Sequence, residues 1–158
     1  MMKTVKLMAA ALMVFGTASG ARADATSAWA GWERQVDAIL AAVNQPGHSE
    51  AKRQGVKAAC TGISRTVAGQ AFTFPSWAQT VMPMCGDIDD LVGGDQVVSK
   101  NEWRFTCRQI KSYADRLARA TPVAAAPTAH EKGLALSTFL ADAYEVQCAH
   151  GIKRVKRI

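Results

Sequence analysis

The chain has 158 residues, 49% of them apolar and 20% charged, with 19 Lys and Arg against 13 Asp and Glu. This is enough material for one domain with a hydrophobic core, and the composition excludes a disordered, collagen-like or low-complexity chain. The formal net charge of +6 is concentrated at the two ends, because residues 24–152 hold 12 cations and 13 acids. We find no basic element with interleaved aromatic residues in this near-neutral body, so we expect no nucleic-acid partner.

The N-terminal residues have the three parts of a secretory signal peptide. Two lysines precede an uncharged, largely apolar run over residues 7–21, which ends in the small-x-small sequence A-R-A. The run is too short to cross a bilayer of roughly 30 Å as a helix. We therefore predict a cleaved signal peptide over residues 1–23, with cleavage after Ala25 as the alternative to cleavage after Ala23. The mature protein is expected to be periplasmic or secreted and to have no transmembrane helix.

Apolar residues recur at three- and four-residue steps along most of the remaining chain. This spacing is typical of amphipathic helices, and no strand alternation or hairpin turn competes with it. We predict an all-α fold, a single-domain bundle of about four to five helices over residues 24–151. The predicted helices begin near Thr26 or Ser27, Ser49, Ser76, Ser99 and Thr128, and they end near Asn44, Gly69, Gly93, Thr121 and Gly151.

Local signals sharpen several of these helices. Two predicted starts carry the S/T-x-x-E capping box, Ser99 with Glu102 and Thr128 with Glu131. Pro83 and Gly86 predict that the third helix is kinked or short, because both residues weaken a helix interior. Four cations lie off the apolar stripe of the second helix and are expected to face water: Lys52, Arg53, Lys57 and Arg65.

All four cysteines lie in the predicted mature chain. An even number in a small exported protein indicates two disulfides, and four cysteines allow three pairings. Cys60 and Cys85 lie almost symmetrically about the turn at residues 70–75, so antiparallel packing of the second and third helices brings them level. Cys107 is near the start of the fourth helix and Cys148 is near the end of the fifth, which also meet if these helices are antiparallel neighbours. We therefore predict the disulfides Cys60–Cys85 and Cys107–Cys148.

Three groups of residues are candidates for metal or cofactor sites. Met82-Pro83-Met84-Cys85 holds soft sulfur ligands suited to monovalent copper, but packing of Met84 in the core is the favoured interpretation. Four acids near Gly93 and Gly94 match no calcium-loop spacing, so a solvated acidic face or a surface for a basic partner is favoured. Three scattered histidines, His48, His130 and His150, complete the candidates. We predict no metal site and no cofactor, and the sequence has no C-x-x-C-H motif for covalent haem.

The last residues, 152–158, form a short basic tail. Its cations are Lys153, Arg154, Lys156 and Arg157. This tail has two interpretations: contact with an anionic membrane surface or a scaffold, or a solvated end that complements the dipole of the last helix. The second interpretation is favoured.

No enzyme motif is present in the sequence, since G-x-S-x-G, H-E-x-x-H, the P-loop and the dinucleotide-binding glycines are all missing. We therefore predict a non-enzymatic module that binds another protein of the cell envelope. By architecture it looks like the small helical immunity or inhibitor proteins that neutralise a toxin or hydrolase. The expected contact surface combines an aromatic anchor with an acidic rim. Its residues are Trp77, Asp87, Asp89, Asp90 and Asp95.

Two alternative functions remain open at this stage. The first is an accessory subunit of an envelope-spanning secretion, conjugation or surface-assembly machine, in which the basic tail contacts membrane or scaffold. The second is a periplasmic carrier of a metal or haem. The sequence does not distinguish oligomeric states.

Overall fold

The computed structural model describes residues 17–47, 49–69, 73–93 and 100–150. These residues form five helices longer than one turn and one single-turn helix, with no strand among them, so the predicted all-α fold is confirmed. The helices are α1 (Thr17–Val43), α2 (Glu50–Ala68), α3 (Ser76–Gln79), α4 (Val81–Gly93), α5 (Lys100–Ala118) and α6 (Ala129–His150). The basic tail and most of the predicted signal peptide lie outside the described residues.

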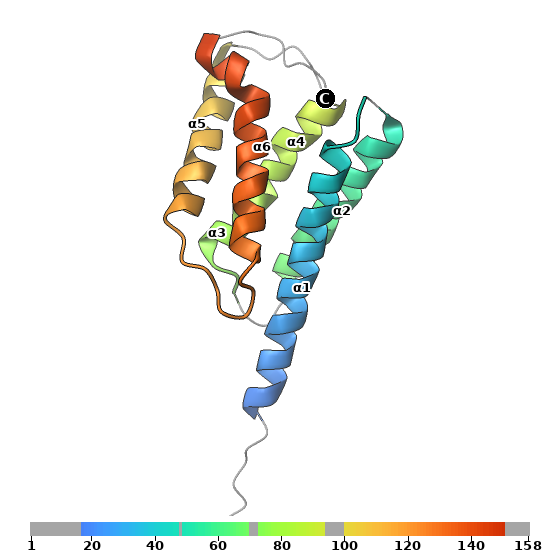
Figure 1. Ribbon diagram of the computed structural model, residues 1–158, viewed down its shortest axis with the longest axis vertical. Coiled ribbons are helices and arrows are strands. Elements are labelled where there is room, and N and C mark those ends of the chain that lie inside the picture. Colours follow the sequence, from blue (N-terminus) through green and yellow to red (C-terminus); the bar gives the residue numbers. More distant parts are fainter. Residues whose placement is uncertain (1–16, 48, 70–72, 94–99, 151–158) are drawn as a thin grey trace, which may run out of the picture.

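The bundle contains two disulfide-bonded helix pairs, α2 with α4 and α5 with α6. Helix α1 contacts both pairs, through α2 and through α6. Helices α1 and α2 form an antiparallel hairpin, α4 packs against α2, and α5 and α6 form a second hairpin (Figure 1). Helix α6 contacts α1 and α4 as well as α5, so it lies at the centre of the arrangement. The N-terminal part of α1 extends beyond the other helices (Figure 1).

Helix α1 begins earlier than the apolar spacing predicts. The expected start was Thr26 or Ser27, whereas the helix starts at Thr17 and therefore continues through the predicted cleavage sites. The intervening segment is rich in alanine, the residue with the highest helix propensity, which allows the helix to extend without packing. The first buried residue described in α1 is Ala28. The apolar spacing thus located the packed part of the helix.

The predicted weakness of the third helix appears as a break at Thr80, between α3 and α4. In a continuous helix, residue 83 would donate its amide N–H to the carbonyl of Gln79, but proline has no such donor. The break places Pro83 third in α4, within the first turn, where no intrahelical partner is required. Gly86 is accommodated inside α4 without interrupting it.

A cluster of aromatic side chains joins α1 to α3 and, through the contact of His130 with Trp77, to α6. Trp29 lies between Phe74 and Trp77, with ring centroids 4.7 and 5.6 Å away. Trp32 packs edge-on against both Trp29 and Trp77, and its indole N–H donates to the Ala78 carbonyl at 3.2 Å. The buried tryptophan N–H groups of such clusters usually need a partner, and this hydrogen bond supplies one.

Both predicted disulfides are confirmed. Cys60–Cys85 joins α2 to α4 with the Cα atoms 5.7 Å apart, and Cys107–Cys148 joins α5 to α6 with the Cα atoms 5.6 Å apart. These separations are ordinary for disulfides. No cysteine of the chain is left free. Each bridge closes one of the two helix pairs.

Lys52 does not face water as the second-helix pattern predicted. Its side chain is only 3% exposed, and its ammonium group donates to the carbonyls of Gln45 and Gly47 at 2.9 and 3.4 Å. These carbonyls belong to the turn after α1, where acceptors lack helical partners. Burial lowers the pKa of Lys52. The predicted cap Ser49 is confirmed, since its hydroxyl accepts the Lys52 amide at 3.1 Å.

Candidate functional site

The first acid of the predicted binding segment, Asp87, lies inside the protein. It is 7% exposed, and its carboxylate accepts a hydrogen bond from the Tyr113 hydroxyl of α5 at 2.9 Å. The Tyr144 hydroxyl of α6 donates to the Asp87 carbonyl at 3.2 Å. Burial raises the pKa of Asp87 to about 6, with the Tyr113 bond opposing the rise and nearby Asp90 adding to it. Asp87 therefore connects three helices, and its burial does not suit the contact role predicted for it.

Trp77 is also placed differently from the expectation. It is 5% exposed and belongs to the aromatic cluster, where it packs against Trp29, Trp32 and the His130 ring. A side chain that holds the core cannot serve as a surface anchor without unfolding part of the bundle. The burial of Trp77 therefore does not suit the anchor role predicted for it.

Two other acids of the segment do reach the surface of α4. Asp90 is exposed, and the Asp89 side chain is 44% exposed. The Oδ1 atom of Asp89 lies 4.0 Å from Nε of Arg53, which is beyond hydrogen-bond distance, and this buried oxygen has no hydrogen-bond partner among the described residues. The Arg53 side chain packs so close to Gly93 that a Cβ atom at position 93 would clash with it. Asp95 lies outside the described residues.

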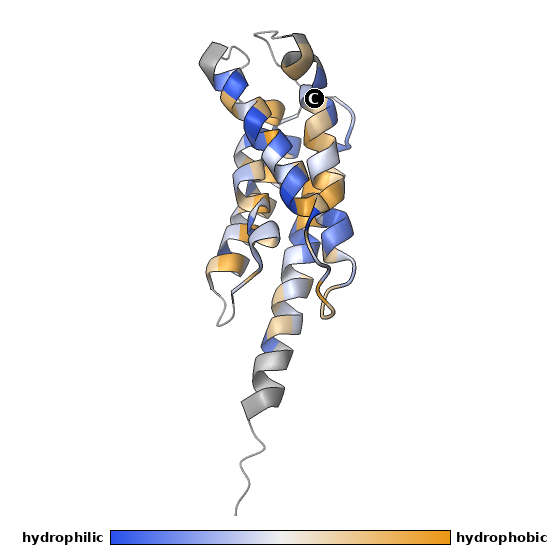
Figure 2. Ribbon diagram, turned by 90° about the vertical axis from the view of Figure 1, so that its left-hand side faces the viewer, coloured by the Kyte–Doolittle hydropathy of each residue, from blue (hydrophilic) through white to orange (hydrophobic). Residues whose placement is uncertain are grey.

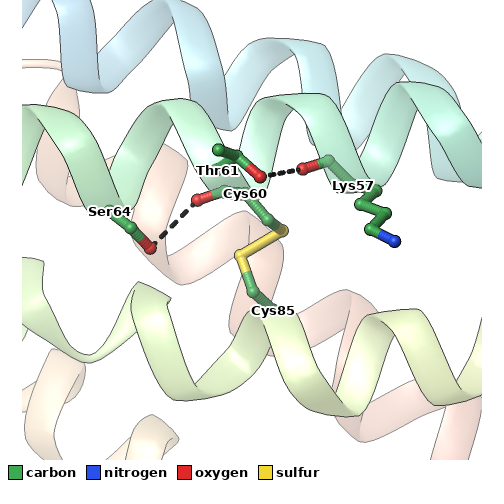
Figure 3. Close-up of a disulfide and its surroundings, with 5 residues drawn as sticks. All are labelled: Lys57, Cys60, Thr61, Ser64 and Cys85. Atoms are coloured by element: carbon green, nitrogen blue, oxygen red, sulfur yellow. Dashed lines mark hydrogen bonds between the residues drawn. A yellow bond between two sulfur atoms is a disulfide. The ribbon is translucent and has the colours of Figure 1, made fainter.

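A shallow hollow of about 280 Å³ lies between α2 and α4, beside Asp89. The Cys60–Cys85 disulfide, which bridges the two helices, is part of its lining. Lys57, Thr61 and Ser64 of α2 also line it (Figure 3). The full lining is Val56, Lys57, Cys60, Thr61, Ser64, Cys85, Gly86 and Asp89. The lining of the hollow is thus uncharged except for the Lys57 ammonium and the Asp89 carboxylate.

The groups around the hollow are suited to binding. Both hydroxyls donate to carbonyls of their own helix, Thr61 to Lys57 at 2.8 Å and Ser64 to Cys60 at 3.2 Å (Figure 3). The cysteines are joined, so neither provides a thiolate nucleophile. The Asp89 side chain, which also lines the hollow, is 44% exposed, so its carboxylate can accept a hydrogen bond from another molecule through its accessible part.

The α2 side of this site is not among the residues predicted from the sequence. The signal was available in the spacing, because residues 57 and 64 stand three before and four after Cys60, and residue 61 stands four after 57 and three before 64. Helical geometry places 57 and 64 beside the cysteine, and 61 beside both of them. Once Cys60 is paired with Cys85, the same face must border α4.

The residues weighed for metal binding have structural roles where they are described. Met84 is fully buried, Met82 is half-buried and Cys85 is in a disulfide. Nε2 of His130 lies 2.7 Å from the Leu117 carbonyl. Within residues that the structure describes, no three His, Cys, Asp or Glu side chains are grouped to hold a metal ion. His48 and the side chain of His150 lie outside this description.

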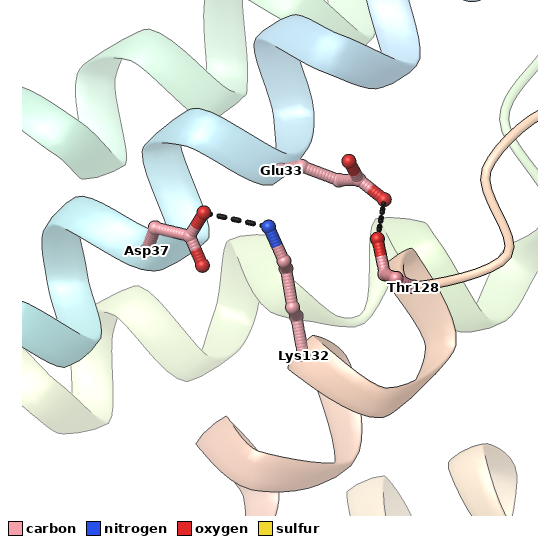
Figure 4. Close-up of polar contacts among 4 residues, drawn as sticks. All are labelled: Glu33, Asp37, Thr128 and Lys132. Atoms are coloured by element: carbon pink, nitrogen blue, oxygen red, sulfur yellow. Dashed lines mark hydrogen bonds and ion pairs between the residues drawn. The ribbon is translucent and has the colours of Figure 1, made fainter.

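Polar contacts also connect α1 to the start of α6. The Thr128 hydroxyl donates to Glu33 at 2.7 Å, and the Lys132 ammonium contacts Asp37 at 2.6 Å (Figure 4). These two contacts join residues 95 positions apart in the sequence. They fix α6 against α1 and leave both carboxylates already engaged within the protein.

Comparisons of the chain with protein-family models, with curated proteins and with solved structures found no match. No helix of the described part of the chain has the length and apolar character needed to span a membrane. Because no relative indicates a function, the functional proposal rests on the hollow between α2 and α4.

Proposed function

We propose that this protein is exported and acts by binding another protein of the cell envelope, in the manner of an immunity or inhibitor protein. The observation that carries the proposal is the hollow between α2 and α4, whose lining includes the 44%-exposed side chain of Asp89. Small-molecule sites usually occupy about 300–1,000 Å³ and enclose their ligand. A shallow hollow of about 280 Å³ is better suited to a side chain projecting from a partner's surface.

The partner is expected to present a basic or amide side chain to this site. Such a group would donate to the Asp89 carboxylate while its stem covers the disulfide and Val56, which also line the hollow. Exposed Asp90, one residue further along α4, would add a second charged contact. Hydrogen bonds from a charged donor to a carboxylate are the stronger kind, and they discriminate against partners that lack such a donor.

The two disulfides support both the rigidity and the location in this proposal. A bridge within each helix pair limits relative movement of α2 and α4, so the hollow is formed before the partner arrives. Preorganisation of this kind reduces the entropy lost on binding. Disulfides form and persist in oxidising compartments, which supports a periplasmic or secreted protein.

The experiment is affinity capture by the oxidised protein from an envelope extract of the cells that produce it, followed by identification of the retained proteins. Thr61→Arg places a long side chain over the hollow, whereas Ala58→Arg adds the same side chain to an exposed position of α2 outside the lining. We expect Thr61→Arg to reduce retention of a specific partner by about tenfold or more, and Ala58→Arg to leave retention unchanged. Equal retention by both variants would exclude the hollow.

The alternative functions give different results in the same experiment. An accessory subunit would retain several subunits of one assembly, and deletion of residues 152–158 would release them. A carrier would bring a metal or haem through purification, visible by metal analysis or absorbance. A toxin or hydrolase captured alone, insensitive to the tail deletion, is the result that supports the inhibitor function.

A further inference from the structure

The outward surface of α5 carries a large apolar side chain surrounded by cations. Phe105 is 58% exposed and is the large hydrophobic residue left exposed in the part of the chain that the structure describes. The inward stripe of α5 includes Ile110, Tyr113 and Leu117, which are buried. Phe105 is not part of this buried stripe, so core packing does not explain a phenylalanine there.

Four exposed cations of α5, and Arg119 directly after the helix, share this surface with two exposed acids of α5. The acids are Glu102 and Asp115. The cations are Arg104, Arg108, Lys111, Arg116 and Arg119. We call these cations together with Phe105 the α5 outer face.

The arginines nearest Phe105 are arranged by their own helix. The Arg104 guanidinium lies 5.9 Å from the Trp103 ring centroid, and Nε of Arg108 donates to the Arg104 carbonyl at 3.2 Å. The two described ion pairs, Arg53 with Asp89 and Lys132 with Asp37, lie on other helices. The α5 outer face therefore presents guanidinium groups to its surroundings.

We infer that the α5 outer face is a second docking surface, and that its occupant is an acidic surface of a partner protein with an apolar recess for Phe105. Arginine and aromatic side chains are enriched among residues that dominate binding at protein interfaces. Planar guanidinium groups pair with carboxylates through two parallel hydrogen bonds. Five cations against two acids complement a surface of the opposite sign.

A protein fits this surface better than a lipid bilayer or a nucleic acid does. Helices that lie in a membrane insert a broad apolar face, whereas Phe105 is the single exposed large apolar side chain described. Binding of single-stranded nucleic acid uses several aromatic side chains on which successive bases stack, and one ring provides a single platform. The inference goes beyond the proposed function, because α5 and α2 lie at opposite edges of the bundle (Figure 1).

The packing of α5 leaves this surface uncovered. Figure 2 faces the side on which α5 lies, where hydrophilic segments are interspersed with hydrophobic ones. Helix α5 packs mainly against α6, with smaller contacts to α3 and α4. No described helix covers the α5 outer face.

The test uses the full oxidised protein with Phe105 replaced by the photoreactive aromatic residue p-benzoylphenylalanine, produced in its native cells and irradiated. Mass spectrometry identifies what is joined to position 105. We expect an adduct to a protein segment of net negative charge. Reversal of one neighbouring cation, Arg108→Glu, should lower the yield about tenfold or more, because like charges facing each other oppose docking. The matched reversal on α2, Arg65→Glu, should change the yield less than about twofold.

Every other outcome overturns the inference. An adduct confined to phospholipid, to nucleic acid or to a second copy of this chain would assign the α5 outer face to that occupant. Equal yields with Arg108→Glu and Arg65→Glu would show that the cations of α5 do not select the partner. No adduct would show that the surface is unoccupied. Partner capture that depends on Thr61 but yields no adduct at position 105 would retain the proposed function and reject this one.

Discussion

The two disulfide-closed helix pairs differ in how they treat charge. In the α2–α4 pair, four cations and one carboxylate of α2 stand against three carboxylates of α4, so the pair is neutral. In the α5–α6 pair, six cations stand against five carboxylates, and Tyr113 of α5 reaches inward to Asp87 of α4. The two pairs therefore differ less in net charge than in placement: Arg53 of α2 lies 4.0 Å from Asp89 of α4, whereas the exposed cations of α5 take no part in the ion pairs of the described residues. Disulfides and apolar packing hold the helices together, which leaves the exposed charges available for binding.

Removing each disulfide is expected to give the largest effects and tests whether the two pairs are held equally. The bridges span 25 and 41 residues. In the chain-entropy account, loss of either one lowers the free energy of unfolding by about 3–4 kcal/mol, slightly more for the longer loop. The variants are Cys60→Ala with Cys85→Ala, and Cys107→Ala with Cys148→Ala, each measured by urea unfolding. A loss below about 1 kcal/mol in one pair would show that packing alone holds that pair.

Asp87 provides an intermediate effect, because it is the contact between the two pairs. Asp87→Ala leaves the buried Tyr113 hydroxyl without its acceptor, whereas Asp87→Asn retains an oxygen at that place. An unsatisfied buried group costs about 1–3 kcal/mol. We therefore expect the alanine variant to be less stable than the asparagine variant by about that amount in urea unfolding. Equal stability of the two variants would mean that the hydrogen bond is dispensable.

The same carboxyl group predicts a pH dependence. Its pKa is raised from 3.8 to about 6 in the folded protein, so the folded state retains a proton that the unfolded state has released. Stability from this group is therefore complete below about pH 4, falls as the pH rises to about 6, and is level above it. Asp87→Asn should flatten this part of the stability profile. A wild-type slope unchanged by the substitution would assign the titration to another group.

The helices and disulfides could be predicted because their signals are local and periodic. Four cysteines on helical stripes, with turns between them, left one pairing consistent with antiparallel neighbours. The start of α1 could not be predicted from the same pattern, because alanine-rich helix before Ala28 depends on propensity rather than burial. Helical periodicity reports packing, and it misses helix that extends beyond the bundle.

The candidate site was harder to predict, because the charge of Asp87 suggested an exposed residue whereas its position in the helix indicated a buried one. Asp87 stands three residues after Met84 and four before Leu91, so helical spacing already placed it on the buried face of α4. Its charge suggested the surface, but Tyr113 and Tyr144 supply the hydrogen bonds that make burial possible. These partners come from distant helices, and no local pattern identifies them.

The link between α1 and α6 should have a smaller effect than Asp87. Lys132 and Asp37 are 2.6 Å apart, but both side chains are partly exposed, so solvent screens their attraction. A double-mutant cycle with Lys132→Met and Asp37→Asn should give a coupling energy of about 0.2–1 kcal/mol that declines at high salt. A larger, salt-independent coupling would mean that the pair is less accessible to solvent than its exposure indicates.

The smallest stability effect is expected at Asp89, and it separates binding from folding most sharply. Asp89 and Arg53 are 4.0 Å apart with both side chains more than 40% exposed, so a substitution at either should change the free energy of unfolding by less than about 0.5 kcal/mol. If the exposed part of the Asp89 carboxylate receives a donor from the partner, Asp89→Asn weakens capture while stability stays constant. Asp87→Asn is the matched control, because it changes a neighbouring carboxylate that faces the interior and should leave capture intact. Equal losses of capture from the two substitutions would place the determinant in the shape of α4 and remove Asp89 from the binding surface.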